Sequence, residues 1–280
     1  MRSFRCWLAA LALAQVLTLS PAWAAPPAPP RRVLYVIQNG PAAPGHGCAK
    51  GPVPGCFGFH HAVTDYSATV LRGIGAQSRA FTLDVTSDAA ATLNRDNLRR
   101  YAAVVFYTTG ELPLTAQEKS EFMAWLRAGH GFVGIHCATD TFYTWPEYEA
   151  MIGGVFNDHP WHAGSRLWVR NEDPKFPSQR QWPKQFQWTD EFYQFSHWSR
   201  SKVHVLTSLD PKRLDMTRPG IRRTDHDFAN SWVKYWGKGR VFYTAFGHDQ
   251  AAWDNPAFRR QVEMGIRWAD GEIHYPVRVP

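Results

Sequence analysis

The segment 131–140, GFVGIHCATD, contains the residue spacing that most clearly indicates chemistry. Gly134, His136 and Ala138 follow the pattern of a strand-to-helix elbow, in which small residues flank one side chain raised at the edge of a sheet. Hydrolases place Ser or Cys at the raised position, whereas this chain places His136 there. Because imidazole transfers protons near neutral pH, we predict a functional role for this residue. The alternative is a structural histidine satisfied by the backbone of a tight turn.

Cys137 lies one residue beyond the raised position of this elbow. A thiol nucleophile needs a neighbouring base or positive surroundings that favour the thiolate, and no base is paired with Cys137 by sequence. We therefore interpret it as a buried structural thiol.

The elements that must position His136 alternate between apolar runs and helical patterns. Continuous apolar runs at 32–38, 102–107 and 132–136 predict strands buried on both faces, as in parallel sheets. Further strands are expected at 81–85, 203–207, 231–235 and 240–245, and helices at 62–75, 145–151, 256–269 and after the capping pair Thr115 and Glu118. This alternation predicts an α/β fold with a doubly wound, mostly parallel sheet flanked by helices.

Ligands of such sheets bind at the carboxyl ends of the strands. His136 ends one expected strand, His248 follows another, and His159 follows a Gly-Gly segment after the elbow helix, so all three can reach one crevice. The segment 157–200 is rich in Trp, Pro and His and is predicted to be an irregular insertion that covers the substrate. Asp140 and Asp190 are expected to cap helices or to orient neighbouring groups.

The two ends of the chain have their own signals. Arg2 and Arg5 precede an apolar run that ends in Ala22-Trp23-Ala24, which predicts a cleaved signal peptide at 1–24 and a periplasmic or secreted protein. A Pro-rich linker is expected at 25–31, one domain at 32–272 and a tail at 273–280. No second apolar segment follows, so we expect no stable membrane span.

The charge pattern argues against nucleic acid as a partner. The formal net charge is +7, but the basic residues are scattered among acids and aromatics instead of forming a stripe. The 13 tryptophans indicate either a large core or aromatic platforms for a ligand.

An ordered series of short motifs resembles one known family. In chain order the sequence has GIHCA, WPxY, GGxF, HP, DExY, GKGRVFY, and GH followed by Trp. Together these motifs resemble the ThuA-like (trehalose-utilisation) family over about residues 32–271. The resemblance implies a class I glutamine-amidotransferase-like, flavodoxin-like sandwich without the amidotransferase nucleophile. It also implies a role in bacterial disaccharide or glycoside utilisation, on keto-sugar intermediates.

Carried over residue by residue, the resemblance implies a pocket built from His136, His159, Glu191 and His248, with His61 as the family's early histidine. The chain departs from the family at Cys137, where Ser is frequent, and at Phe176-Pro177, where His-Pro is frequent.

The residue types add candidates for ligand contact and for a cofactor. Aromatic side chains that could stack on a sugar are Trp145, Trp161, Tyr193 and Trp253, although each Trp also suits a core. Imidazoles with one carboxylate suit a divalent metal, for which His136, His159 and His248 are candidates. No compact metal motif joins them, so acid–base and hydrogen-bonding roles are the preferred interpretation.

Two functions therefore remain open. The first is an enzyme that acts on a glycoside or keto-sugar, in which a His or Glu191 moves a proton beside a carbonyl or glycosidic oxygen by elimination, hydration or isomerisation. The second is a non-catalytic sugar-binding accessory protein that uses the same pocket. The sequence does not fix the oligomeric state.

Cys48 and Cys56 flank a Gly/Pro loop and are predicted to form a disulfide in an oxidising compartment. The processed chain would then contain one free thiol, Cys137, and loss of the short bridge should cost at most a few kcal/mol. Thiol counting under denaturing conditions checks this, because three free thiols per chain would contradict the bridge.

Overall fold

The computed structural model describes residues 29–43 and 56–279. The predicted signal peptide and Cys48 lie outside the described residues, as does most of the predicted linker. The linker's last residue, Arg31, already belongs to the first strand.

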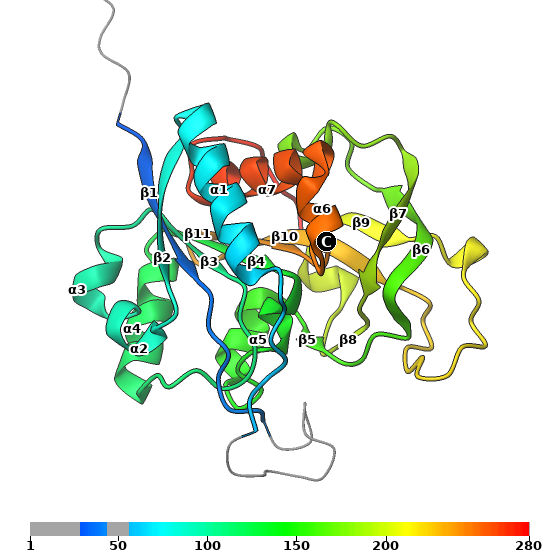
Figure 1. Cartoon of the computed structure of the whole chain (residues 1–280), viewed down its shortest axis with the longest axis horizontal. Helices are drawn as coiled ribbons and strands as arrows, with labels where there is room; N and C mark the ends of the chain where they lie inside the picture. Colours follow the sequence, from blue (N-terminus) through cyan, green and yellow to red (C-terminus); the bar gives the residue numbers. More distant parts are fainter. Residues whose placement is uncertain (1–28, 44–55, 280) are drawn as a thin grey trace, which may run out of the picture.

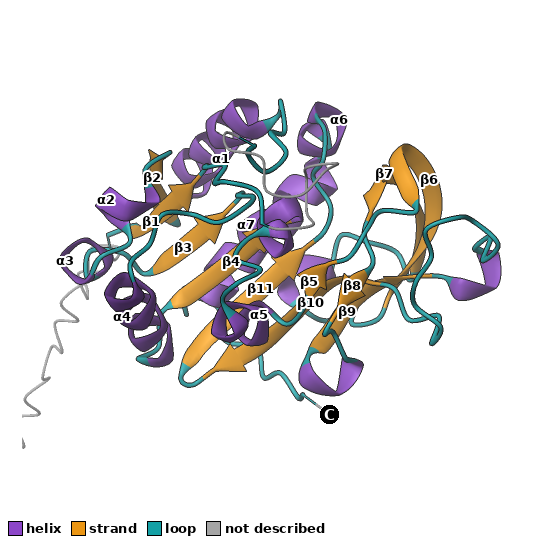
Figure 2. Ribbon diagram, turned by 90° about the horizontal axis from the view of Figure 1, so that it is seen from below, coloured by secondary structure: helices purple, strands orange, loops and turns teal. Residues whose placement is uncertain are grey.

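The first half of the main sheet is parallel. Its five neighbouring strands follow the order β2-β1-β3-β4-β11 (Figure 2). Their bounds are β1 Arg31–Val36, β2 Phe81–Thr86, β3 Ala103–Phe106, β4 Gly131–Ile135 and β11 Gly239–Thr244. Three of these strands, β1, β3 and β4, are the predicted apolar runs, and in β3 and β4 every residue is buried.

The second half of the sheet is antiparallel and continues the order as β11-β10-β9-β6-β7. Its strands are β6 Trp161–Asn171, β7 Gln185–Phe192, β9 His204–Leu209 and β10 Ala229–Trp236; a separate pair joins β5 Val155–Phe156 to β8 Phe195–Ser196. The sheet is therefore mixed, and the expectation of a mostly parallel sheet holds only for its first half.

The prediction that 157–200 is irregular was wrong, because β6 and β7 form a long hairpin at the sheet edge (Figure 1). In β7, exposed Gln185, Gln187 and Thr189 alternate with buried Phe186 and Trp188. This period of two is the signal of a strand with one buried face. The many Trp, Pro and His residues of the segment concealed that signal.

Helices cover both faces of the parallel half (Figures 1 and 2). One core cluster joins Val33 and Tyr35 of β1 to α1, α6 and α7, and the other joins Leu34 and Val36 to α2, α3, α4 and α5. The helix bounds are α1 Thr64–Ser78, α2 Ala89–Thr92, α3 Arg95–Leu98, α4 Ala116–Arg127, α5 Pro146–Ile152, α6 Gln250–Asp254 and α7 Pro256–Ala269. Short 3₁₀ turns occur at η1 His136–Asp140, η2 Pro177–Gln179, η3 Arg200–Lys202 and η4 Pro211–Arg213.

Local sequence signals explain where these helices begin. The predicted capping box at α4 is present, since Thr115 accepts from the backbone of Glu118 and the Glu118 carboxylate accepts from the backbone of Thr115. Asn255 caps α7, and Pro256 occupies its first turn, where a missing N–H costs nothing.

The C-terminal tail packs against the antiparallel half. The Tyr275 hydroxyl donates to Asp173, and the backbone oxygen of Arg278 lies 3.1 Å from His204 Nδ1. Within the described part of the chain, no helix has the length and apolar character needed to cross a membrane.

Replacing two glycines by alanine tests the packing of this fold, because the two changes should shift the free energy of unfolding in opposite directions. A Cβ on Gly134 would lie 2.9 Å from Tyr243 and 3.2 Å from both Ala138 and Ile152, so Gly134→Ala should destabilise the protein by about 1–3 kcal/mol. Gly73 lies within α1 with open space around it, so Gly73→Ala should stabilise by about 0.5–1 kcal/mol. Urea unfolding of both variants measures this, and equal effects would contradict the packing at the elbow.

Candidate functional site

The elbow after β4 holds His136 in an unusual backbone conformation. Its φ is +47°, in the left-handed region that non-glycine residues seldom occupy, and its side chain is fully buried. His136 Nδ1 lies 2.7 Å from the backbone oxygen of Ala245, so this nitrogen carries a proton and donates it. The opposite nitrogen, Nε2, lies 2.8 Å from the Tyr193 hydroxyl and 3.4 Å from Glu191 Oε2. The elbow therefore aims one imidazole nitrogen at a carboxylate.

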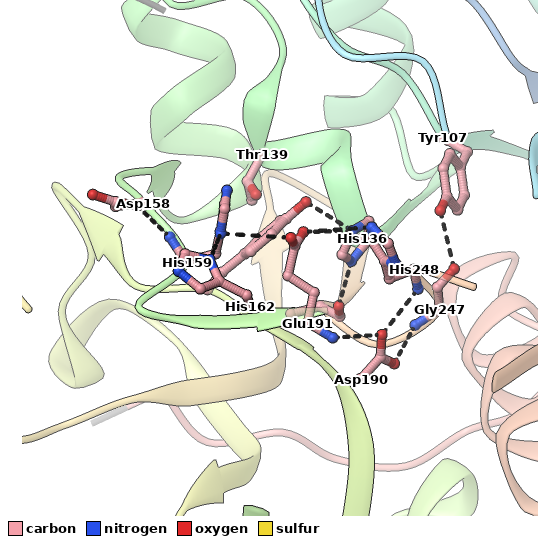
Figure 3. A network of polar contacts seen from close by, with 12 residues as sticks. Tyr107, His136, Thr139, Asp158, His159, His162, Asp190, Glu191, Gly247 and His248 are labelled. Atoms are coloured by element: carbon pink, nitrogen blue, oxygen red, sulfur yellow. Dashed lines mark hydrogen bonds and ion pairs between the residues drawn. The ribbon is translucent and has the colours of Figure 1, made fainter. Parts of the chain in front are cut away.

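Glu191, near the end of β7, lies at the centre of three imidazoles (Figure 3). Its Oε2 is 3.4 Å from His136 Nε2 and 4.0 Å from His248 Nε2, while its Oε1 is 3.5 Å from His159 Nδ1. The structure thus brings together the four residues predicted to form one pocket.

His61 joins the same cluster from the loop before α1. Its ring centroid lies 4.8 Å from that of His136 and 5.2 Å from that of His248. Although His61 is only 5% exposed, its Nδ1 has no hydrogen-bond partner among the described residues, and the same holds for His248 Nδ1. Among the described residues, two imidazole nitrogens are therefore buried without a hydrogen-bond partner.

Burial and neighbouring charges both shift the pKa values of the residues in this cluster. Burial alone would raise the pKa of Glu191, but its contacts with His136 and the other imidazoles outweigh that effect and lower the pKa to about 2. Burial lowers the pKa of His136, yet the Glu191 carboxylate reverses the sign and raises it. Burial, together with the neighbouring imidazoles, lowers the pKa of His61 and of His248. The site therefore combines one stable carboxylate with imidazoles whose pKa values are shifted in opposite directions.

Asp190 holds the backbone of the residues that carry the cluster. It is fully buried and accepts four N–H groups, from the Trp188 indole and from the backbones of Glu191, Gly247 and His248. Burial raises its pKa despite these donors. Asp190 therefore fastens the end of β7 to the loop after β11, as the sequence analysis expected of an orienting residue.

A cavity of about 330 Å³ opens beside the cluster. His61, His159, Glu191 and Tyr193 contribute to its wall. The remaining lining residues are Ala42, Ala43, Gly58, Phe59, Gly110, Asp140, Tyr143 and Phe156. A more open cleft near Arg170, Glu172 and Arg200 is larger, at about 890 Å³, but contains none of the predicted site residues.

Sequence reasoning missed the place of Asp140 and Tyr143 in this wall. The Tyr143 hydroxyl donates to the Asp140 carboxyl, and burial raises the pKa of Asp140 to about 6. Their position four and seven residues after His136 was the available signal, because a short turn after an elbow keeps such residues near the raised side chain.

Three of the four aromatic candidates for sugar stacking are core residues instead. Trp145, Trp161 and Trp253 are 7%, 1% and 0% exposed and do not line the cavity. Trp161 packs on Phe228, and the Trp253 indole donates to the backbone oxygen of Gly247. Burial of their large apolar area in the core determines where these indoles lie.

The cysteines follow the sequence analysis where they are described. Cys137 is a free thiol, 1% exposed, and burial raises its pKa well above the usual range, which disfavours the nucleophilic thiolate. Cys56 is disulfide-bonded, but Cys48 lies outside the described residues, so their pairing stays a prediction.

Fold and site together define an α/β protein whose mixed sheet gathers imidazoles and a carboxylate at strand ends. A family model described as ThuA, trehalose utilisation, matches residues 55–269, and the chain belongs to this family.

Solved structures of ThuA-like proteins share the fold. A ThuA-like protein from Bacteroides uniformis has a TM-score of 0.67 at 22% identity, covering 89% of this chain and 95% of that one. A ThuA-like protein from Parabacteroides merdae has a TM-score of 0.61 at 16% identity, covering 89% and 93%. No match was found among curated proteins.

Asp190→Asn tests whether this carboxylate holds the site together. Each Asp190 oxygen accepts two N–H groups, so either orientation of an asparagine amide would turn its own NH₂ toward two donors. We expect a loss of at least about 3 kcal/mol of unfolding free energy, measured in urea. The matched control is Asp249→Asn in the same loop, since asparagine caps α6 as well as aspartate does. Equal stabilities of the two variants would contradict the role of Asp190.

Proposed function

We propose that this chain is an exported enzyme of bacterial carbohydrate utilisation that acts on a glycoside or a keto-sugar intermediate. The observation that carries the proposal is the convergence of Glu191 with His136, His159 and His248 beside one cavity. Membership of a family described by trehalose utilisation supports the ligand class. The basic residues and apolar run before Ala24 support export.

The cavity suits one sugar unit held by mixed contacts. Its volume of about 330 Å³ lies at the small end of ligand pockets. Phe59, Phe156 and Tyr193 offer aromatic surface, while Asp140 and His159 offer groups that bond hydroxyls. The combination of aromatic faces and polar atoms is what a sugar ring, apolar on its faces and polar at its edge, requires.

His159 is the imidazole placed to move a proton. Its side chain is 36% exposed and lines the cavity, and its Nδ1 faces Glu191 Oε1 at 3.5 Å. An ionised Glu191 stabilises the imidazolium that forms when His159 accepts a proton. Asp140, whose pKa burial raises to about 6, is a second carboxyl on the cavity wall and can donate a proton.

For a keto-sugar these groups support an elimination. His159 takes the proton from the carbon beside the carbonyl, and the electrons of that C–H bond form a C=C bond. The glycosidic C–O bond breaks at the carbon next to the one that lost its proton, and the leaving oxygen receives a proton from Asp140. Atoms and charges balance without an oxidant or a further reactant.

Glu191→Gln and His159→Gln test the proposal with oxidised and unoxidised disaccharides as substrates. Each variant should lower kcat/KM by about 10²–10⁴-fold, the usual contribution of a group that transfers protons. His197→Gln is the matched control, because His197 is exposed and pairs with Glu149 away from the cavity lining. Cys137→Ser should also leave turnover within a few-fold.

A hundredfold loss in Cys137→Ser would instead identify the thiol as the nucleophile. If the wild-type protein binds disaccharides without converting any of them, the chain is a sugar-binding accessory protein and the enzymatic proposal fails. Calorimetric titration of the same sugars separates binding from turnover.

A further inference from the structure

The cluster around Glu191 has the composition and spacing of a metal site. His61, His136, His248 and Glu191 each offer one ligand atom, and these four atoms lie within 4.8 Å of one another. Zinc bonds of about 2.0–2.2 Å place tetrahedral ligands about 3.4 Å apart, so each donor would need to shift by less than about 1 Å. Side-chain rotation covers such a shift.

A second, independent observation is the unsatisfied state of two of these imidazoles. His61 Nδ1 and His248 Nδ1 are buried and have no hydrogen-bond partner among the described residues. A buried polar atom without a partner costs stability, so native proteins seldom retain one without a reason. A bound cation would offset the cost of burying these rings, although His248 meets Glu191 through Nε2 and its Nδ1 would stay without a partner among the described residues.

The surroundings also support coordination. Histidines that bind metals usually donate their second ring N–H to a backbone oxygen or carboxylate, which fixes the ring. His136 does this through Nδ1 to Ala245, which leaves Nε2 directed at Glu191. Asp190 accepts the backbone N–H groups of Glu191 and His248 and so fixes the chain at these two residues.

We propose that His61, His136, Glu191 and His248 bind one divalent transition-metal ion of the zinc type. Three nitrogens and one carboxylate oxygen suit zinc and related ions, whereas magnesium and calcium prefer oxygen ligands. This set differs from the candidates expected from sequence, because His61 replaces His159. His159 faces Oε1 of Glu191, and His136 and His248 face Oε2.

The metal site deepens the proposed function. Metal binding stands on its own, whereas a catalytic role of the ion rests on the proposed function. His61 and Glu191 line the cavity, so the bound ion would lie at the cavity wall. With four protein ligands, a keto-sugar carbonyl oxygen would have to approach the ion as a fifth ligand, where it would be polarised while His159 acts on the neighbouring carbon. The ligand class is therefore a sugar that carries a carbonyl group.

Metal binding is tested on the untagged, full processed chain after dialysis against a chelator. Calorimetric titration with Zn²⁺ should show one site per chain, and Co²⁺ should give the intense visible absorption of a tetrahedral ion. His61→Gln and His248→Gln should each weaken Zn²⁺ binding by at least about 100-fold, since even groups that only support ligands contribute about 10–100-fold. His197→Gln, the matched control, should stay within about threefold.

Absence of stoichiometric Zn²⁺ binding by the folded wild-type protein would overturn the proposal. So would unchanged affinity in both His61→Gln and His248→Gln when circular dichroism shows that they fold. The two proposals can fail separately: turnover of a sugar by the metal-free protein would retain the enzyme and remove its metal role. Stoichiometric zinc binding without turnover of any sugar would retain the metal site and remove the enzymatic proposal.

Discussion

The candidate site depends on one buried carboxylate, Asp190, which joins the two halves of the sheet. It accepts N–H groups from β7 in the antiparallel half and from the loop after β11, the last parallel strand. Glu191 and His248 are neighbours of these anchored groups, so their separation is set by Asp190 and not by their own contacts. Asp190 therefore fixes the end of β7 to the loop after β11, while Tyr193 and Glu191 make the separate contacts to His136 at the elbow.

Glu191 provides the charge that allows several imidazoles to be buried together. Four histidines around one cavity would repel each other on protonation, and burial already disfavours their charged forms. Burial lowers the pKa of His136, but the Glu191 carboxylate outweighs burial and raises it, whereas burial and the neighbouring imidazoles lower the pKa values of His61 and His248. The same cluster thus contains imidazoles whose pKa values are shifted in opposite directions.

Much of the parallel half was predictable from sequence, because strands buried on both faces read as apolar runs and the α4 capping box is a local signal. The gathering of His136, His159, His248 and Glu191 was also predictable, from strand ends and family motifs. The β6–β7 hairpin was not, since its alternation was obscured by its unusual composition. The positions of Trp145, Trp161 and Trp253 were equally inaccessible, because type and spacing do not distinguish an indole in a core from one in a cavity.

Position 136 has two requirements: a backbone with positive φ and an imidazole side chain. The turn accepts residues that tolerate positive φ, which are Gly, Asn and Asp besides His, and it disfavours Val, Ile and Thr. The imidazole bonds Ala245 and Tyr193, and under the proposed function it also serves the chemistry. Over evolutionary time, relatives that lost the activity but kept the fold are therefore expected to drift at this position toward Asn, Asp or Gly. The residue found there would divide the family into members that retain the chemistry and members that retain only the architecture.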